Sequence, residues 1–164
     1  MNSSIVSIGL SNPGQPIPQF EIARFMNMAH QLDEAEGRKL GFLYRMSGIE
    51  SRHSVLEDFD KLSVEDFSFF PANQTLSPFP GTKVRMEVFQ KTAPDLATEA
   101  VRSCLLQAGQ NSASLTHLIL VSCTGMVAPG VELQLMEKLG LSDSVERYCI
   151  CLLYTSPSPR DRTR

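Results

Sequence analysis

The run LTHLILVSC, residues 115–123, places the strongest constraint on how this chain folds. Its centre, residues 118–121, consists only of large aliphatic side chains, so the segment has no polar face. A strand with this pattern is buried on both faces, which is typical of a parallel sheet covered by helices on both sides. The sequence therefore predicts an α/β fold in which this run forms an inner, parallel strand.

Further segments supply the other strands and the helices of such a fold. Residues 3–10 are apolar and β-branched and predict a buried first strand, and residues 145–150 predict another strand. Apolar residues at helical spacing predict four helices. These helices cover about residues 19–32, 40–47, 83–108 and 131–139.

Glycine and proline mark where these elements end. Glycines that directly follow a helical pattern are the expected C-terminal caps. They are Gly48, Gly109 and Gly140. Pro94 lies inside the third helical pattern and is expected to kink or restart that helix. The Pro-rich stretch at residues 69–82 predicts a surface loop.

Composition excludes several classes of protein. With 164 residues and a formal net charge of −3, the chain offers no general positive field for nucleic acid. It begins without the pattern of a secretory signal, and no apolar run approaches the roughly 18 residues that span a bilayer. The four cysteines lack the spacing of a zinc site. We therefore expect a cytoplasmic protein without a metal, whose thiols are mostly core residues.

Three stretches of the chain carry a resemblance to a known family. They are LYRMSGIESRHSVL (residues 43–56), RMEVFQKTAPDLATEAVRSCLLQAG (85–109) and LTHLILVSCTGMVAPGVELQLMEKLGLSDSVERYCI (115–150). Together they resemble the N-terminal half of type III polyketide synthases, the chalcone and stilbene synthase family of the thiolase superfamily. The resemblance implies a thiolase-like α/β fold over residues 1–150, with a parallel-rich sheet and layered helices, present here as the N-terminal half only.

The resemblance also implies an activity. Members of this family are acyltransferases that condense malonyl units from malonyl-CoA onto an acyl-CoA starter. A cysteine thiolate carries the acyl group, and a His–Asn pair stabilises the developing oxyanion and the ionised sulfur. The resemblance therefore implies CoA thioesters as substrates and a homodimer as the assembly. It implies no cofactor, no nucleic acid partner and no membrane.

Candidate site residues follow from the same resemblance. Basic residues near the second helix bind the CoA phosphates in the family, which implies this role for Lys39 and Arg45. Cys123 and Thr124 end the central strand, where open parallel sheets bind ligands, and the resemblance assigns them to the starter-unit pocket. Ala128 matches the position that reaches across the dimer into the partner's cavity. The alternatives are a solvated helix face and small residues at a strand end.

Two further residues are expected to be structural. Arg52 is expected to pair with a nearby carboxylate, such as that of Glu50 or Glu57. His117 opens a strand and is expected to be a satisfied edge histidine.

The chain departs from the family after Ile150. The family's nucleophilic cysteine follows this strand at a tight turn into a helix, whereas Pro157 and Pro159 forbid a helix here. Residues 151–164, CLLYTSPSPRDRTR, resemble the conceptual translation of a sequencing adapter. A native disordered basic tail is the alternative, and a nucleic-acid arm of this size would bind weakly. No catalytic residue is therefore assigned, and the chain is expected to be inactive as given.

Two other functions stay open at this point. One is a fragment of the ketoacyl-ACP synthase III branch, which shares the GI-x-x-R segment and the strand before the nucleophile. The other is a non-catalytic module that binds CoA or blocks dimers of a complete enzyme. The residues that follow Ile150 in the gene, with the later His and Asn context, would distinguish the first from a polyketide synthase. An open reading frame in independent genomic DNA that ends in residues 151–164 would favour the second.

Overall fold

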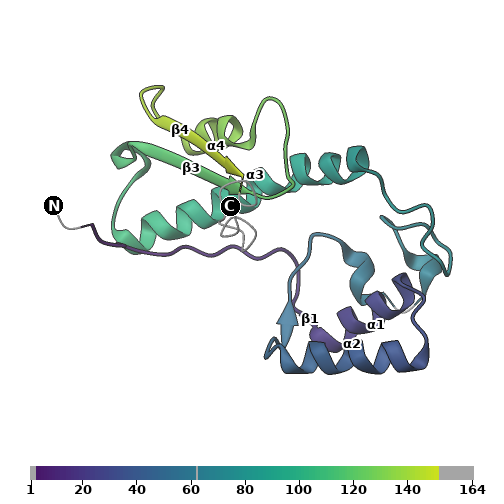
Figure 1. The fold of residues 1–164 in the computed structure, drawn as a ribbon. Coiled ribbons are helices and arrows are strands. Elements are labelled where there is room, and N and C mark those ends of the chain that lie inside the picture. Colours follow the sequence, from purple (N-terminus) through teal and green to yellow (C-terminus); the bar gives the residue numbers. More distant parts are fainter. Residues whose placement is uncertain (1–2, 62, 152–164) are drawn as a thin grey trace, which may run out of the picture. The chain divides into compact units, whose positions relative to one another are not determined.

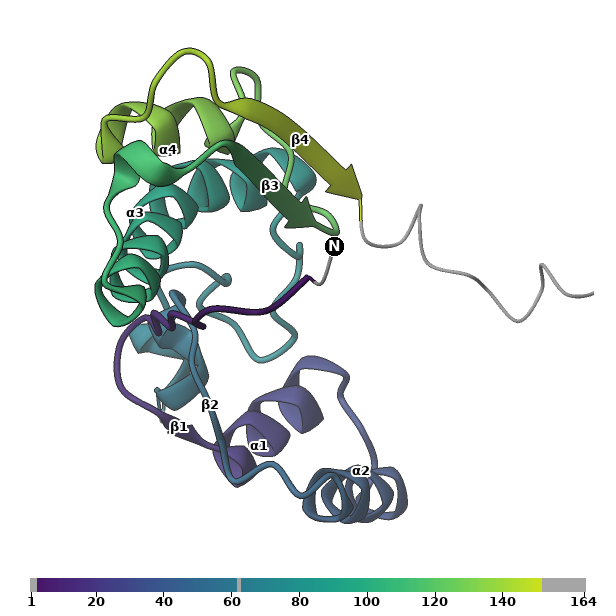
Figure 2. The same ribbon diagram turned by 90° about the vertical axis from the view of Figure 1, so that its left-hand side faces the viewer.

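The computed structural model describes residues 3–61 and 63–151, and the chain folds into two compact units. One unit contains residues 3–11 and 85–151, and the other contains residues 12–61 and 63–84. Figures 1 and 2 show the elements of both units from two directions. The elements are β1 (Ile17–Pro18), α1 (Gln19–Ala29), α2 (Glu34–Met46), β2 (Ser51–Arg52), α3 (Thr82–Ala108), β3 (His117–Ser122), α4 (Val131–Leu139) and β4 (Glu146–Cys151), with short 3-10 helices at Glu57–Asp60, Val64–Asp66 and Ser112–Ser114.

A parallel βαβ unit is the centre of the first compact unit. β3 and β4 pair in parallel with His117 opposite Glu146 and Ser122 opposite Cys151, and α4 connects them. Leu118 and Leu120 of β3 pack against the buried core of this unit. That core contains Val131, Leu135, Met136, Leu139, Leu141 and Val145, and α3 covers it with Phe89, Ala93, Ala97 and Val101. The predicted α/β class and the parallel pairing of residues 115–123 are confirmed.

The second face of the two strands is open in the part of the chain that the structure describes. Ile119 and Val121 are 57% and 53% exposed, and Tyr148 and Ile150 of β4 lie beside them on the same face. The sequence predicted that β3 would be buried on both faces, but the structure buries only one face. The alternation of the strand therefore separates a core face from an apolar outer face.

The first strand expected from the sequence is absent from the structure. Residues 3–11 form an extended segment without strand pairing, and its apolar side chains are exposed. The segment instead runs alongside α3 (Figure 1), where the Ser7 hydroxyl donates to the backbone oxygen of Cys104 at 2.8 Å. A Cβ at Gly9 would collide with the α3 backbone at Ala100 and Cys104. Small residues thus hold the segment against a helix rather than against β3.

The long helix α3 passes through Pro94 without a break. The prediction was a kink or a restart at Pro94; the bounds of α3 are Thr82–Ala108, so a restart is wrong. The Thr98 hydroxyl donates to the Pro94 backbone oxygen at 2.7 Å, and both residues are buried. Gly109 follows the helix with a φ of +62°, as the predicted glycine cap requires.

Two helices and an aromatic cluster form the second compact unit. α1 ends at Ala29, three residues earlier than predicted, and a capping box of Asp33 and Glu36 begins α2. Gly48, with a φ of +68°, follows α2 as predicted. The stretch at residues 69–82 is a loop but not merely a surface loop, because Leu76 is fully buried in it. Leu76 shares a core with Phe25 and Ala29, and Phe59, Phe67 and Phe70 surround them.

A buried carboxylate orders the start of that loop. Asp58 is fully buried, and its two oxygens accept hydrogen bonds from the backbone N–H groups of Ser68, Phe69 and Phe70 and from the Ser68 hydroxyl. Burial raises the pKa of Asp58, but these hydrogen bonds to its ionised form lower it more, so the pKa lies below the ordinary value of 3.8. The ionised carboxylate therefore replaces the partners that the loop backbone lacks.

β4 ends at Cys151, one residue past the predicted domain boundary, where Cys151 lies opposite Ser122. The remainder of the predicted tail, residues 152–164, lies outside the described residues.

Candidate functional site

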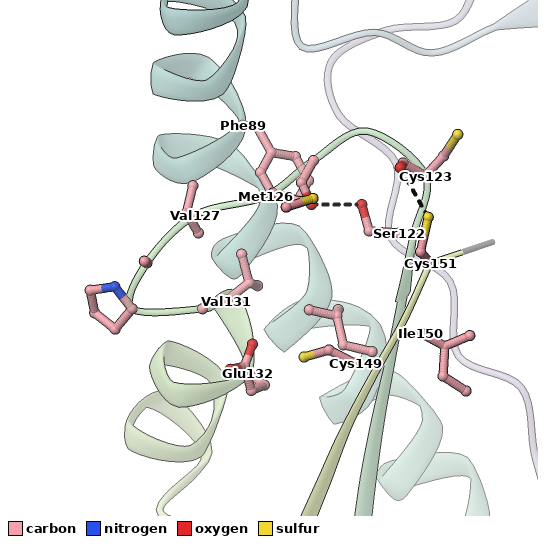
Figure 3. Close-up of a pocket in the computed structure, with 15 residues that line it drawn as sticks. Phe89, Ser122, Cys123, Met126, Val127, Val131, Glu132, Cys149, Ile150 and Cys151 are labelled. Atoms are coloured by element: carbon pink, nitrogen blue, oxygen red, sulfur yellow. Dashed lines mark hydrogen bonds between the residues drawn. The ribbon is translucent and has the colours of Figure 1, made fainter. Parts of the chain in front are cut away.

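A hollow of about 350 Å³ lies where the carboxyl ends of β3 and β4 meet the start of α4 (Figure 3). Parallel sheets place their ligands at this edge, because the loops that leave the strands diverge there. The lining residues come from α3, β3, β4, the loop after β3 and the first turn of α4. They are Phe89, Leu120, Ser122, Cys123, Gly125, Met126, Val127, Ala128, Pro129, Gly130, Val131, Glu132, Cys149, Ile150 and Cys151.

The loop between β3 and α4 closes one side of the hollow. The Ser122 hydroxyl donates to the Gly125 backbone oxygen at 3.0 Å, which turns the chain directly after the strand. Gly125 lies so close to the Phe89 ring that a Cβ there would collide with it. The peptide bond between Ala128 and Pro129 is cis, and Gly130 then begins α4 as its N-cap. This side of the hollow is therefore shaped by the close approach of the loop backbone at Gly125 to Phe89 and by the start of α4 at Gly130.

Glu132 and Cys149 supply the polar contact on the inner wall. Glu132 lies in the first turn of α4, where a carboxylate is stabilised by the free N–H groups of the helix. Partial burial, the hydrogen bond to Glu132 and the charge of Glu132 raise the pKa of the Cys149 thiol above its ordinary value of 9.0. Figure 3 shows the Cys149 sulfur on the side of β4 that faces Glu132. The raised pKa keeps the Cys149 thiol protonated, and a protonated thiol is a poor nucleophile.

Two of the three predicted pocket residues line the hollow. Cys123 and Ala128 line the hollow. Thr124, which lies between them in the sequence, is exposed and does not line the hollow. The Cys151 thiol donates to the Cys123 backbone oxygen at 3.7 Å, which joins the ends of the two strands.

Sequence reasoning missed Glu132 and Cys149. Glu132 carries a local signal, since it lies two residues after the Pro-Gly that begins the helix. Cys149 carries no such signal, because only the register of β4 against Leu120 turns it into the hollow. All four cysteines are free, and Cys123, Cys149 and Cys151 are exposed. The expectation that the thiols are mostly core residues is therefore wrong.

The two candidate CoA-binding cations lie on α2 but line different hollows. Lys39 lies beside Ala35, Arg38, Phe42 and Leu43. Arg45 lies in the groove between α1 and α2, with Asn27 and Tyr44. Both side chains are exposed. The second compact unit therefore does not join them into one phosphate clamp.

Arg52 and His117 were both expected to be structural, and the structure gives a partner for each. The Arg52 side chain donates from Nε to the Gln19 side-chain oxygen at 2.9 Å, so neither Glu50 nor Glu57 is its partner here. His117 begins β3, lies 3.8 Å from the Glu146 carboxylate and stacks on the Tyr148 ring. Its role as a partnered histidine at a strand start is confirmed.

Within residues 3–61 and 63–151, no group of three or more His, Cys, Asp or Glu side chains is arranged to hold a metal ion. None of the helices in this part of the chain is long and apolar enough to cross a membrane.

A parallel βαβ unit with a small hollow at the carboxyl ends of its strands defines an α/β domain of the kind that binds small molecules at that edge. The chain matches the family described as chalcone and stilbene synthases, N-terminal domain, over residues 2–156, and it belongs to that family.

Named relatives agree with this assignment. The chain is 33% identical over 153 residues to "Probable polyketide synthase 1" of Dictyostelium discoideum. This alignment covers 93% of this chain and 4% of that protein. It is 26% identical to "Type III polyketide synthase A" of Arabidopsis thaliana, over 92% of this chain and 37% of that protein. The chain thus spans little more than a third of the plant relative and a far smaller share of the amoebal one.

Solved structures give the same result for the fold. PKS-I from the brown alga Ectocarpus siliculosus superposes with a TM-score of 0.76 at 29% identity, covering 90% of this chain and 38% of that one. The C-terminal type III polyketide synthase domain of "Steely1", a type I/III hybrid from Dictyostelium, gives 0.66 at 28% identity, covering 93% and 40%. The chain has the thiolase-like fold of these proteins, represented by its N-terminal half.

Proposed function

We propose that the chain forms one wall of the acyl-binding cavity in an enzyme that condenses malonyl units from malonyl-CoA onto an acyl-CoA starter. The observation that carries the proposal is the hollow at the carboxyl ends of β3 and β4, in a chain that belongs to the chalcone and stilbene synthase family. The relatives are named polyketide synthases, which favours this reaction over that of a ketoacyl-ACP synthase.

The reaction has two bond-forming steps. A cysteine thiolate attacks the starter thioester, so that a new thioester forms on the enzyme and CoA leaves. Malonyl-CoA then loses CO₂, and the resulting enolate carbon attacks the enzyme-bound thioester and releases the thiolate. Fixed hydrogen-bond donors stabilise the oxyanion in both steps. The described residues would contribute to binding and to the exclusion of water, through the apolar lining at Leu120, Val127 and Val131.

The lining residues supply thiols but not the other catalytic groups. Cys123, Cys149 and Cys151 are present, whereas His and Asn are absent from the residues that line the hollow. Cys149 is held protonated by its surroundings, and Cys123 ends a strand rather than beginning a helix. We therefore expect the chain by itself to release no CO₂ from malonyl-CoA.

The remaining roles are extensions of the same proposal. Lys39 and Arg45 would contact CoA phosphates separately, because they line different hollows. Ala128 would border the partner subunit's cavity in a homodimer. The enzyme would work in the cytoplasm with CoA thioesters as substrates and without a metal or cofactor.

The test is a hybrid enzyme in which residues 3–150 of this chain replace the matching part of the brown algal PKS-I. The hybrid should release CO₂ and CoA from malonyl-CoA and an acyl-CoA starter. Ala128→Met should slow turnover of long starters more than short ones, because the larger side chain takes space at the mouth of the hollow. Leu133→Met, on the exposed side of α4, is the matched control. A hybrid that folds and dimerises but forms no product would contradict the proposal.

A further inference from the structure

One charged side chain lies among uncharged residues in the hollow at the carboxyl ends of β3 and β4. The lining that the structure describes includes apolar side chains such as Phe89, Leu120 and Val127, and Glu132 is its only acidic or basic residue. Among the ion pairs found in the described part of the chain, none includes Glu132. The described wall of the hollow therefore carries a negative charge that no cation of that wall balances.

The start of α4 holds the Glu132 carboxylate at this wall. Glu132 lies in the first turn of α4, and a Cβ at Gly130, the N-cap of the helix, would collide with both of its carboxylate oxygens. The side chain therefore folds back over its own helix start, into space that a larger residue at position 130 would fill. The free N–H groups of a helix start stabilise a negative charge placed there. The absence of a side chain at Gly130 thus fixes where the charge lies.

The effect of this charge extends across the hollow to β4. The register of β4 places Cys149 opposite Leu120, and Figure 3 shows the Cys149 sulfur on the side of the strand that faces Glu132. Burial, and after it Glu132, raises the pKa of the Cys149 thiol. A negative charge that disfavours a thiolate on the opposite wall also disfavours any anion that enters the space between the two walls.

We propose that Glu132 is a specificity-determining residue that admits uncharged acyl groups to the hollow and excludes acyl groups that carry a carboxylate. This inference rests on the proposed function, because it concerns which acyl starter that site accepts. A carboxylate in the hollow would lose its hydration, find no cation among the described lining residues and lie close to a like charge. An uncharged acyl chain would instead transfer apolar surface from water to the apolar lining.

The exclusion would also keep the two substrates of the reaction apart. Malonyl-CoA carries a free carboxylate until it loses CO₂, whereas an uncharged acyl-CoA does not. With Glu132 in place, the malonyl group would serve as the extender and be a poor starter. The structure thus assigns to one side chain of α4 a selection between starter and extender.

The first experiment measures, on the whole chain, how the charge of a small reagent changes its reaction with the Cys149 thiol. Iodoacetamide and iodoacetate are similar in size, and both form a C–S bond to the thiolate with loss of iodide, but only iodoacetate is an anion. Peptide mass spectrometry gives the two alkylation rates at Cys149. Glu132→Gln should shift their ratio toward iodoacetate by about threefold to tenfold, and added salt should reduce the shift. A change in the thiol pKa alters both rates equally and cancels in the ratio.

Matched controls separate the charge in the hollow from a general effect. The ratio at Cys104, which belongs to α3 and does not line the hollow, should be the same in all variants. Glu137→Gln removes an exposed acid from the same helix and should leave the ratio at Cys149 unchanged. Glu132→Asp keeps the charge and should keep the ratio within about twofold of the parent value. An unchanged ratio at Cys149 in Glu132→Gln would overturn the proposal.

The second experiment uses the hybrid with the brown algal PKS-I and two starters of equal chain length. Hexanoyl-CoA is uncharged at the end of its acyl chain, and adipoyl-CoA has a carboxylate there. Glu132→Gln should raise the ratio of kcat/KM for adipoyl-CoA to that for hexanoyl-CoA by about threefold to tenfold. Equal use of the two starters by the parent hybrid would overturn this inference and leave the proposed function intact. A folded hybrid that uses no starter would contradict the proposed function, and the alkylation ratio would then decide the inference alone.

Discussion

Cys149 on β4 and Glu132 on α4 both line the hollow (Figure 3), and Glu132 raises the pKa of the Cys149 thiol. The pair joins the last strand of the βαβ unit to the start of its helix. Because the carboxylate is negatively charged, it opposes ionisation of the thiol, and the thiol stays protonated at neutral pH.

Glu132→Gln should make Cys149 more reactive. Burial and Glu132 both raise the pKa of the thiol, and removing the charge takes away part of that effect. A lower pKa means more thiolate at a given pH, so alkylation of Cys149 by iodoacetamide should become several-fold faster. Peptide mass spectrometry across a pH series measures the rate. Glu137→Gln, an exposed acid on the same helix, is the control, and equal rates in both variants would contradict the assignment.

Asp58→Asn should lower the free energy of unfolding by about 2–4 kcal/mol, because four hydrogen bonds to an ionised acceptor are lost or weakened. Urea denaturation monitored by circular dichroism measures the change. Asp60→Asn, at an exposed position in the same short helix, should have little effect.

The same carboxylate predicts a pH dependence of stability. Since the folded pKa of Asp58 is below 3.8, its contribution is present above that ordinary value and is lost as the pH falls through the folded pKa. The parent chain should therefore lose stability in acid more steeply than Asp58→Asn. Identical slopes of unfolding free energy against pH for the two proteins would show that Asp58 has no such role.

Gly9→Ala should release the N-terminal segment from α3. A Cβ at residue 9 would collide with the helix backbone at Ala100 and Cys104, and backbone cannot move aside cheaply. Limited proteolysis within residues 3–11 should become faster, while the amides of β3 and α4 stay protected from hydrogen exchange. Gly41→Ala is the control, because a Cβ there meets nothing and a helical alanine is favoured over glycine. An unchanged rate of proteolysis within residues 3–11 would mean that the contact is unimportant.

Ile119→Thr with Val121→Thr should reduce self-association of the chain. Both side chains belong to the open face of β3 and β4, and contiguous exposed apolar surface promotes association. Threonine keeps the strand propensity but lowers the apolar area. Size-exclusion chromatography should show a larger monomer fraction, and dye binding to exposed apolar surface should fall. Leu106→Gln, at an exposed position on α3, should not reproduce this shift, and a parent chain that is already monomeric would refute the prediction.

Local patterns predicted where three helices end, but not where α2 begins, which is Glu34 rather than about residue 40. Gly48, Gly109 and Gly140 all take positive φ angles directly after their helices, because a helix terminus depends only on neighbouring residues. The parallel strand at residues 117–122 was also predictable, since four aliphatic residues in a row leave few other placements.

Features that depend on distant partners were not predictable from the same patterns. Residues 3–10 have the composition of a strand, but the contacts of Ser7 and Gly9 with α3 are made across a long sequence separation. Arg52 contacts Gln19 rather than a nearby carboxylate, because β1 and β2 bring the two side chains together. The Glu132–Cys149 pair likewise depends on strand register, which no short motif encodes.

The register of β4 has a consequence for insertions and deletions in this family. Leu120 and Cys149 share a face, whereas Val121 and Ile150 share the opposite one, so side chains alternate with every step along the strand. A shift of one residue within β4 would turn Cys149 away from Glu132 and direct Tyr148 or Ile150 toward the helix. A shift of two residues would keep the faces intact and change only which side chain lies deepest. Length changes are therefore tolerable in the turn before β4, while inside the strand only even-numbered changes preserve the inner wall of the hollow.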